Sequence, residues 1–204
     1  MNLLHRADGF IAVDKPPGLN VIPGREGGEH AKGLLEARLG QRLWVVHRLD
    51  RDTSGVLLFA LNADTHRTLS MAFEKGEVHK RYVAVAQGRL EAEQLIDQPI
   101  AEGRKGRMKV AEGGKPSRTR VRPLEALKNA TLVEAEPLTG RTHQIRVHLS
   151  HVGHALVFDP RYQHGEQSAH IARTPLHAAR LEWGGVVIES ALPADIRALI
   201  EALR

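Results

Sequence analysis

A polar nine-residue segment between two apolar runs constrains the fold of this chain more than any other feature. Residues 47–55, HRLDRDTSG, contain two acids, two arginines, a histidine and two hydroxyls. Residues 43–46 before them and residues 56–60 after them are short and apolar, which is typical of strands. The sequence therefore predicts a polar turn between two strands. Loops that are held by rigid elements in this way commonly carry binding and catalytic residues.

Asp50 is the acid in this turn that is best placed for chemistry. It lies directly after the first apolar run, with Arg48 and Arg51 on either side, which suits an ionised nucleophile or base. The same neighbours suit a purely structural ion pair, and the residues alone leave both interpretations open. Asp52 is expected to bond its own backbone as a turn residue. We do not expect the two acids to act as a catalytic pair, because such carboxyl groups usually lie about 5–10 Å apart and come from separate elements.

A second polar segment, residues 138–149, reads LTGRTHQIRVHL. It carries four cationic or imidazole side chains, Arg141, His143, Arg146 and His148. The pattern predicts a helix over residues 142–151, with Thr139 or Gly140 near its N-terminal cap. A helix N-terminus favours anions, so these side chains indicate an anion-binding or catalytic site. The alternative is an ordinary polar helix face.

The remaining pattern predicts an α+β fold with a mixed, mostly antiparallel central sheet and flanking helices. Strands are expected at residues 10–13, 78–86, 119–127 and 131–138, and a hairpin at residues 176–183 and 186–190. Helices are expected at residues 32–39, 63–73 and from Pro193 to residue 203, with Asn62 as a cap and Gly40 and Gly76 as ends. At 204 residues, one domain is the default expectation, although two compact lobes are possible.

Composition bounds the function. The chain has 29 Lys and Arg against 24 Asp and Glu, a formal charge of +5, which favours a polyanionic partner. Residues 101–118 are rich in glycine and basic residues, and predict a basic hairpin or arm that contacts RNA. The chain has no cysteine and, over its printed length, no signal peptide or apolar run of about 18 residues. We therefore expect a cytoplasmic protein that does not cross a membrane.

The histidines between residues 143 and 177 lack the spacing that is typical of a metal site. They are His143, His148, His151, His154, His164, His170 and His177. Only His148 and His151 have a spacing that suits one helix face, and no H-E-x-x-H motif or set of acids accompanies them. We therefore expect no metal.

Tyr82 lies in the expected strand at residues 78–86, after Lys80 and Arg81. A tyrosine in a strand usually serves packing. The neighbouring cations also suit a platform on which an RNA base stacks, and the residues alone leave both interpretations open.

Taken together, these segments resemble the RluA-type family of pseudouridine synthases. The resemblance runs from residues 13–19, VDKPPGL, to residues 176–178, LHA, and is most specific over residues 47–55 and 139–148. It implies an RNA-modifying isomerase that converts uridine to pseudouridine in structured RNA without cofactor or metal. It also implies the family's mixed, mostly antiparallel sheet with a catalytic cleft across its middle.

The resemblance implies a role for each matching residue. Asp50 would be the essential carboxylate, Arg146 its cationic partner, and Tyr82 the aromatic surface under the flipped uracil. Arg48 would help to displace the target base. Further substrate-binding residues would be Ile145, Arg141, His143 and Leu176. No S4-like RNA-binding domain fits before Phe10, so we expect a single catalytic domain over residues 1–204.

One segment departs from the family pattern. The family usually has a glycine directly before the aspartate that corresponds to Asp159, whereas this chain has Phe158 there and Pro160 after it. Asp159 and Tyr162 match the pattern, so the departure concerns the local turn and not the proposed carboxylate.

Our first hypothesis is therefore an isomerase acting on ribosomal RNA, transfer RNA or both, and we expect it to be a monomer. The second is a non-catalytic RNA-binding or ribosome-assembly module that keeps the motifs as structure. The third is a hydrolase with a histidine-bound metal. Residues 20–30 and 101–118 are the loops expected to influence the choice of RNA.

Overall fold

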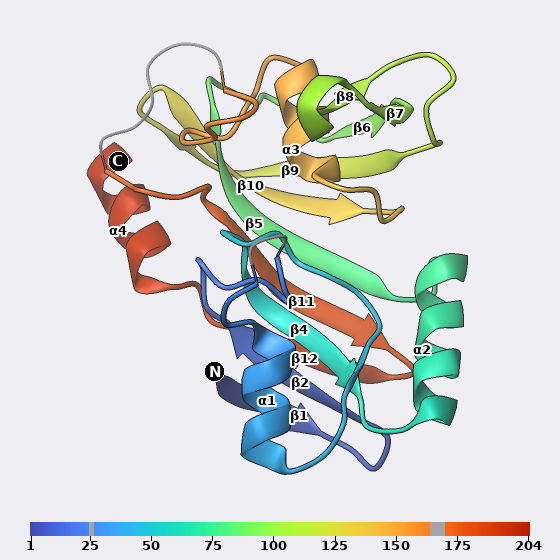
Figure 1. Ribbon diagram of the computed structural model, residues 1–204. Helices are drawn as coiled ribbons and strands as arrows, with labels where there is room; N and C mark the ends of the chain where they lie inside the picture. Colours follow the sequence, from blue (N-terminus) through green and yellow to red (C-terminus); the bar gives the residue numbers. More distant parts are fainter. Residues whose placement is uncertain (25–26, 164–169) are drawn as a thin grey trace. The chain divides into compact units, whose positions relative to one another are not determined.

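The computed structural model describes residues 1–24, 27–163 and 170–204. The chain forms two compact units, which are drawn in Figure 1. The first unit contains residues 1–79 and 178–191, and the second contains residues 80–177 and 192–204. Strands in both units pair mainly in the antiparallel sense, and four α-helices accompany them, so the predicted α+β class is confirmed. None of the helices in the described segments is long and apolar enough to cross a membrane.

Strands of the first unit follow one another in the order β1-β2-β4-β11, while β3 pairs with β4 and β12 with β11. The strands are β1 (Asn2–Arg6), β2 (Phe10–Lys15), β3 (Trp44–Val45), β4 (Ser54–Ala60), β11 (Leu176–Trp183) and β12 (Val186–Glu189). All residues of β4 are buried, as the apolar run predicted. The run at residues 43–46 forms only the two-residue strand β3, which is shorter than expected.

The two helices of the first unit begin and end within two residues of the predicted bounds. They are α1 (Ala31–Leu39) and α2 (Ala63–Lys75). The Asn62 side-chain oxygen accepts a hydrogen bond from the Thr65 N–H at 2.8 Å and caps α2. Gly40 and Gly76 adopt left-handed backbone conformations and end α1 and α2. Leu69 and Ala72 of α2 are buried in a core shared with β2 and β4.

Strands of the second unit follow the order β5-β10-β9-β6, and β7 pairs with β8 as a separate hairpin. The strands are β5 (His79–Gln87), β6 (Gln94–Asp97), β7 (Ile100–Glu102), β8 (Met108–Val110), β9 (Arg118–Leu127) and β10 (Ala130–Pro137). The helices are α3 (Gln144–His151), α4 (Ala194–Leu203) and the short 3-10 turn η1 (Arg104–Gly106). The predicted turn between β9 and β10 is present, with Asn129 in the left-handed region.

Alternating side chains of β5 serve two cores, because successive residues of a strand point to opposite faces of its sheet. Ala84 and Ala86 belong to the core that contains Leu149 of α3. Val85, between them, belongs to the core that contains Leu199 of α4. Helices α3 and α4 therefore cover opposite faces of this sheet.

The basic segment at residues 101–118 was predicted to be a hairpin or an arm, and it contains a hairpin. Ala101 of β7 lies opposite Lys109 of β8, and η1 joins the two strands. Lys105 adopts a left-handed backbone conformation in η1, with φ of 54°. The side chains of Arg104, Lys105, Arg107 and Lys109 are exposed. We call residues 100–110 the basic hairpin.

Gly55 occupies a position that no other residue can fill. Its φ is +111°, and a β-carbon added there would clash with the backbone of Ala178 in β11. We expect Gly55→Ala to lower the free energy of unfolding by about 3 kcal/mol or more, because clash and backbone strain add. The control is Gly40→Ala, where φ is +65° but space is open, and about 1 kcal/mol is expected. Equal losses in urea unfolding would contradict this account of Gly55.

Candidate active site

The polar segment at residues 47–55 forms the predicted turn before β4. The Thr53 N–H donates to the Asp50 carbonyl oxygen at 3.1 Å, which closes a four-residue turn from Asp50 to Thr53. Thr53 and Ser54 are buried, so the segment enters β4 directly from this turn. The carboxylate of Asp50 is thus carried on a turn that is anchored to a fully buried strand.

A buried lysine holds this turn in place. The Lys15 ammonium donates to the carbonyl oxygens of Pro16 at 2.8 Å, Leu19 at 2.9 Å and Arg51 at 3.0 Å. The side chain is fully buried, and an ammonium in the interior is costly unless its three N–H groups have acceptors. Arg51 returns a bond from its Nε to the Gly18 carbonyl oxygen at 3.1 Å. The sequence pattern alone did not predict this role of Lys15.

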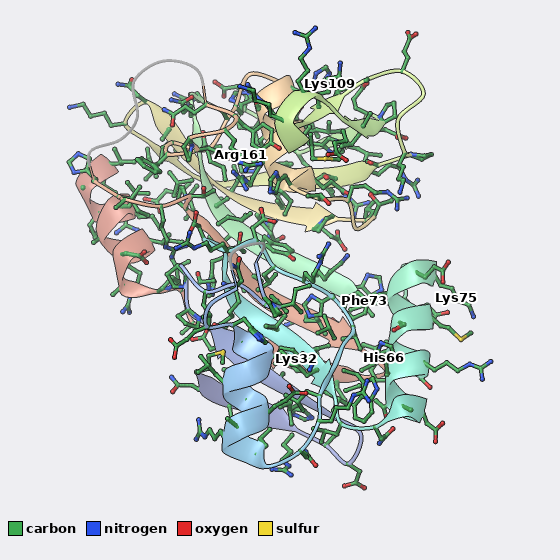
Figure 2. All side chains as sticks on the ribbon, viewed as in Figure 1. Lys32, His66, Phe73, Lys75, Lys109 and Arg161 are labelled. Atoms are coloured by element: carbon green, nitrogen blue, oxygen red, sulfur yellow. The ribbon has the colours of Figure 1, made fainter. Side chains whose placement is uncertain are left out.

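His47 and Arg48 begin the turn segment, and the first is packed into the protein whereas the second is exposed. His47 Nε2 accepts the Leu58 N–H at 2.9 Å, and the His47 ring stacks on Phe73 with 4.7 Å between the ring centroids. Phe73 lies on α2, where Figure 2 labels it. His47 is thereby built into the framework of the first unit. Arg48 is exposed, as a residue that contacts an RNA substrate would need to be.

Three of the predicted substrate-binding residues lie together in the second unit. Ile145 and Leu176 belong to one hydrophobic core, and Tyr82 of β5 packs against that core while remaining partly exposed. The aromatic ring therefore has an apolar backing, which suits either packing or the stacking of a base. Burial lowers the pKa of Lys80, two residues earlier on β5, although the Glu136 carboxylate opposes that shift.

Helix α3 begins at Gln144, two residues later than predicted, and its N-cap is His143 in a left-handed conformation. Neither Thr139 nor Gly140 is the cap. The cause is the buried Gln144 side chain, whose oxygen accepts from the Arg141 N–H at 3.0 Å and from Thr139 Oγ1 at 2.6 Å. These bonds hold the preceding residues in a turn and not in a helix. The sequence pattern did not predict this role of Gln144.

The other polar residues of this motif also bond to the protein itself. Arg141 donates from Nε to the Pro116 carbonyl oxygen at 3.2 Å but is otherwise exposed. His148 is fully buried between Thr119 Oγ1 at 2.8 Å and the Gln98 carbonyl oxygen at 3.0 Å. Burial lowers the pKa of His148, which favours its neutral form. We therefore assign His148 to the framework of the second unit.

Arg146 is buried in a two-point ion pair with Asp159. Its Nε donates to Asp159 Oδ2 at 2.7 Å and its Nη2 to Oδ1 at 2.8 Å. Asp159 is 0% exposed and Arg146 is 7% exposed. Oδ1 also accepts the backbone N–H groups of Arg161 and Tyr162, so a tight turn forms despite the unusual Phe158 and Pro160. This arrangement fixes the orientation of the Arg146 guanidinium.

The predicted residues divide between the two units. Asp50 and Arg48 lie in the first unit, whereas Tyr82, Arg141, His143, Ile145, Arg146 and Leu176 lie in the second. Within the described residues, no group of three or more histidine, cysteine, aspartate or glutamate side chains could hold a metal. His164 lies outside the described residues, as do positions 25 and 26 of the loop expected to influence the choice of RNA.

Comparison with known protein families identifies the chain. The family model described as RNA pseudouridylate synthase matches residues 9–151, a range that contains both polar motifs. The chain belongs to this family. The RluA-type resemblance seen in the sequence is thereby confirmed, and it is supported by the curated relatives below.

Two curated relatives align with nearly the whole length of this pseudouridylate synthase family member. Ribosomal large subunit pseudouridine synthase D of Nitrosomonas europaea is 37% identical, over 100% of this chain and 65% of the relative. Ribosomal large subunit pseudouridine synthase C of Vibrio cholerae is 38% identical, over 98% of this chain and 66% of the relative. The chain thus spans slightly less than two thirds of the length of these relatives.

Two solved structures share the fold. Human RNA Pseudouridylate Synthase Domain Containing 1 has a TM-score of 0.78 and 29% identity, over 94% of this chain and 82% of that chain. Human RNA Pseudouridylate Synthase Domain Containing 4 has a TM-score of 0.83 and 23% identity, over 100% of this chain and 93% of that chain. The second likeness concerns the fold alone.

The Arg146–Asp159 pair generates a stability prediction. We expect Asp159→Ala to lower the free energy of unfolding by about 3–5 kcal/mol, because it deprives a buried guanidinium of its carboxylate. The matched control is Glu134→Ala, which breaks the more exposed pair with Arg122 and should cost less than about 1 kcal/mol. Urea unfolding measures both losses, and a cost for Asp159→Ala no larger than the control would contradict the assignment.

Proposed function

We propose that this chain isomerises uridine to pseudouridine in RNA, with Asp50 as the essential carboxylate. The observation that carries the proposal is the family match over residues 9–151. The local structure supports it, because the buried Lys15 ammonium bonds the Arg51 carbonyl of the Asp50 turn and ties it to the carbonyls of Pro16 and Leu19. An enzyme needs its reacting group held in one geometry before the substrate arrives.

The reaction breaks the N1–C1′ bond, rotates the uracil and forms a C5–C1′ bond. C5 loses its proton to water and N1 gains one, so the product is an isomer of the substrate. The base cannot rotate inside a stack, so it must first leave the stack. In the proposal, exposed Arg48 helps to displace the base and occupies the gap. Tyr82 supports the displaced uracil on its ring, and Ile145 and Leu176 provide the apolar backing behind it.

Asp50 has three chemically reasonable routes. Its carboxylate can attack C1′, add to C6 of the ring or remove a proton from C2′. Each route requires the ionised form. Arg146 is the proposed cationic partner, and its rigid pairing with Asp159 supports this role because the guanidinium is already oriented. No step requires a cofactor or a metal.

RNA is the proposed partner, and ribosomal or transfer RNA the proposed substrate. The exposed arginines and lysines of the basic hairpin suit phosphate groups, and exposed Arg141 and partly buried His143 lie in the adjoining motif. The curated relatives are named for the large ribosomal subunit, which makes that RNA the first to test. We propose that residues 1–204 form one catalytic domain and that the protein acts as a monomer.

The Asp50 proposal predicts a separation of turnover from binding. With ribosomal and transfer RNA transcripts labelled with tritium at uridine C5, we expect Asp50→Asn to lower tritium release by roughly a thousandfold or more. RNA affinity in a filter-binding assay should stay near that of the unchanged protein. Asp52→Asn, in the same turn, is the matched control and should retain most turnover. Release by Asp50→Asn at the control rate would remove Asp50 from the mechanism. A binding module would release no label even when unsubstituted.

The Tyr82 proposal predicts that the ring matters more than the hydroxyl. We expect Tyr82→Phe to stay within about threefold of the original turnover, and Tyr82→Leu to lose about 10- to 100-fold, because stacking is lost only in the second variant. The same tritium assay, performed at saturating RNA, distinguishes them. Equal losses in the two variants would show that stacking is not what Tyr82 contributes.

A further inference from the structure

Tyr162 lies where three parts of the second unit meet. It belongs to a small core with Val147 of α3 and Ile100 of β7, against which Met108 of β8 also packs. It is 3% exposed. The residue therefore connects the basic hairpin to the helix that carries Arg146.

Each polar atom of Tyr162 has a partner. Its backbone N–H donates to Asp159, and its carbonyl oxygen accepts from Ser150 Oγ of α3 at 2.7 Å. Its hydroxyl accepts the Met108 N–H at 3.2 Å and lies 2.7 Å from His143 Nδ1. Burial raises the pKa of Tyr162, so the hydroxyl keeps its proton at neutral pH. The hydroxyl is thus bonded both to the hairpin, through Met108, and to the α3 motif, through His143.

Two guanidinium groups share the ring of Tyr162. The Arg146 carbon Cζ lies 5.0 Å from the ring centroid, and that of Arg107 lies 5.4 Å from it. Both distances are within the range in which an aromatic ring attracts a cation. Arg146 is buried, whereas Arg107 belongs to the exposed hairpin. Two like charges held around one ring repel each other, and an anion bound to the exposed one reduces that repulsion.

We propose that Tyr162 is a positioning residue that links the basic hairpin to Arg146, so that RNA phosphate bound at Arg107 tightens the hold on the Arg146 guanidinium. The inference rests on the proposed function, because it takes RNA as the ligand and Arg146 as part of the site. Tyr162 itself touches no reacting atom. It acts through the orientation of Arg146, whose guanidinium is also bonded to Asp159.

Steady-state kinetics test this link, because the effect of each variant on kcat is measured separately from its effect on KM. Arg107→Ala and its matched control Lys109→Ala each remove one exposed positive charge from the hairpin, and both should raise KM for RNA. Of these two variants, only Arg107→Ala should also lower kcat, by about 3- to 10-fold, because Arg107 and not Lys109 lies over the Tyr162 ring. Tyr162→Phe removes both hydroxyl bonds and should lower kcat by a similar factor with little change in KM. A purely structural Tyr162 would affect thermal stability but not kcat.

Side-chain NMR gives a readout that does not depend on turnover. In the protein with ¹⁵N-labelled arginine, we expect added RNA transcript to slow hydrogen exchange at the Arg146 Nε–H. The slowing should persist in Lys109→Ala and disappear in Arg107→Ala. Identical behaviour of these two variants, or no slowing in the unchanged protein, would overturn the inference. If RNA slows exchange but no tritium is released, the proposed isomerase activity fails while the link stands.

Discussion

The buried ion pair between Arg146 and Asp159 is the interaction on which the second unit's part of the site depends. A guanidinium in the interior is stable only when a carboxylate and hydrogen bonds replace the water it has lost. Asp159 supplies both oxygens, and its own position is fixed by the backbone N–H groups of Arg161 and Tyr162. The pair therefore ties α3 to the loop that follows it and leaves the guanidinium one orientation.

The first unit also holds a buried cation by hydrogen bonds to oxygen atoms. Lys15 directs its ammonium to three carbonyl oxygens, one of which belongs to Arg51 in the Asp50 turn. Carbonyl groups cluster around a cation because each would otherwise lack a hydrogen-bond donor in the interior. In both units, then, oxygen atoms hold a buried cation in place. In the first unit Lys15 fixes the backbone next to Asp50, and in the second the cation is the proposed catalytic side chain Arg146 itself. Such rigidity is what a preorganised site requires.

Much of the dense motif at residues 139–148 serves to hold the protein together. Gln144 and His148 bond to Thr119 and its neighbours, and Arg141 bonds to Pro116, so the start of α3 is fastened to the segment that follows the basic hairpin. The density of polar groups singles out this segment, but it does not distinguish substrate contacts from such internal bonds. That distinction depends on which groups are buried, because only a buried polar group must find its partner within the protein.

The sequence by itself determined the elements whose causes are local. Asn62, Gly40 and Gly76 mark helix ends because capping depends on neighbouring residues, and strands follow from alternating or continuous apolar runs. Only the tertiary structure decided that α3 begins at Gln144, that Arg146 pairs with a residue 13 positions away, and that Lys15 reaches a carbonyl 36 positions away. Those partners are selected by burial, which arises only when distant segments pack together and exclude water.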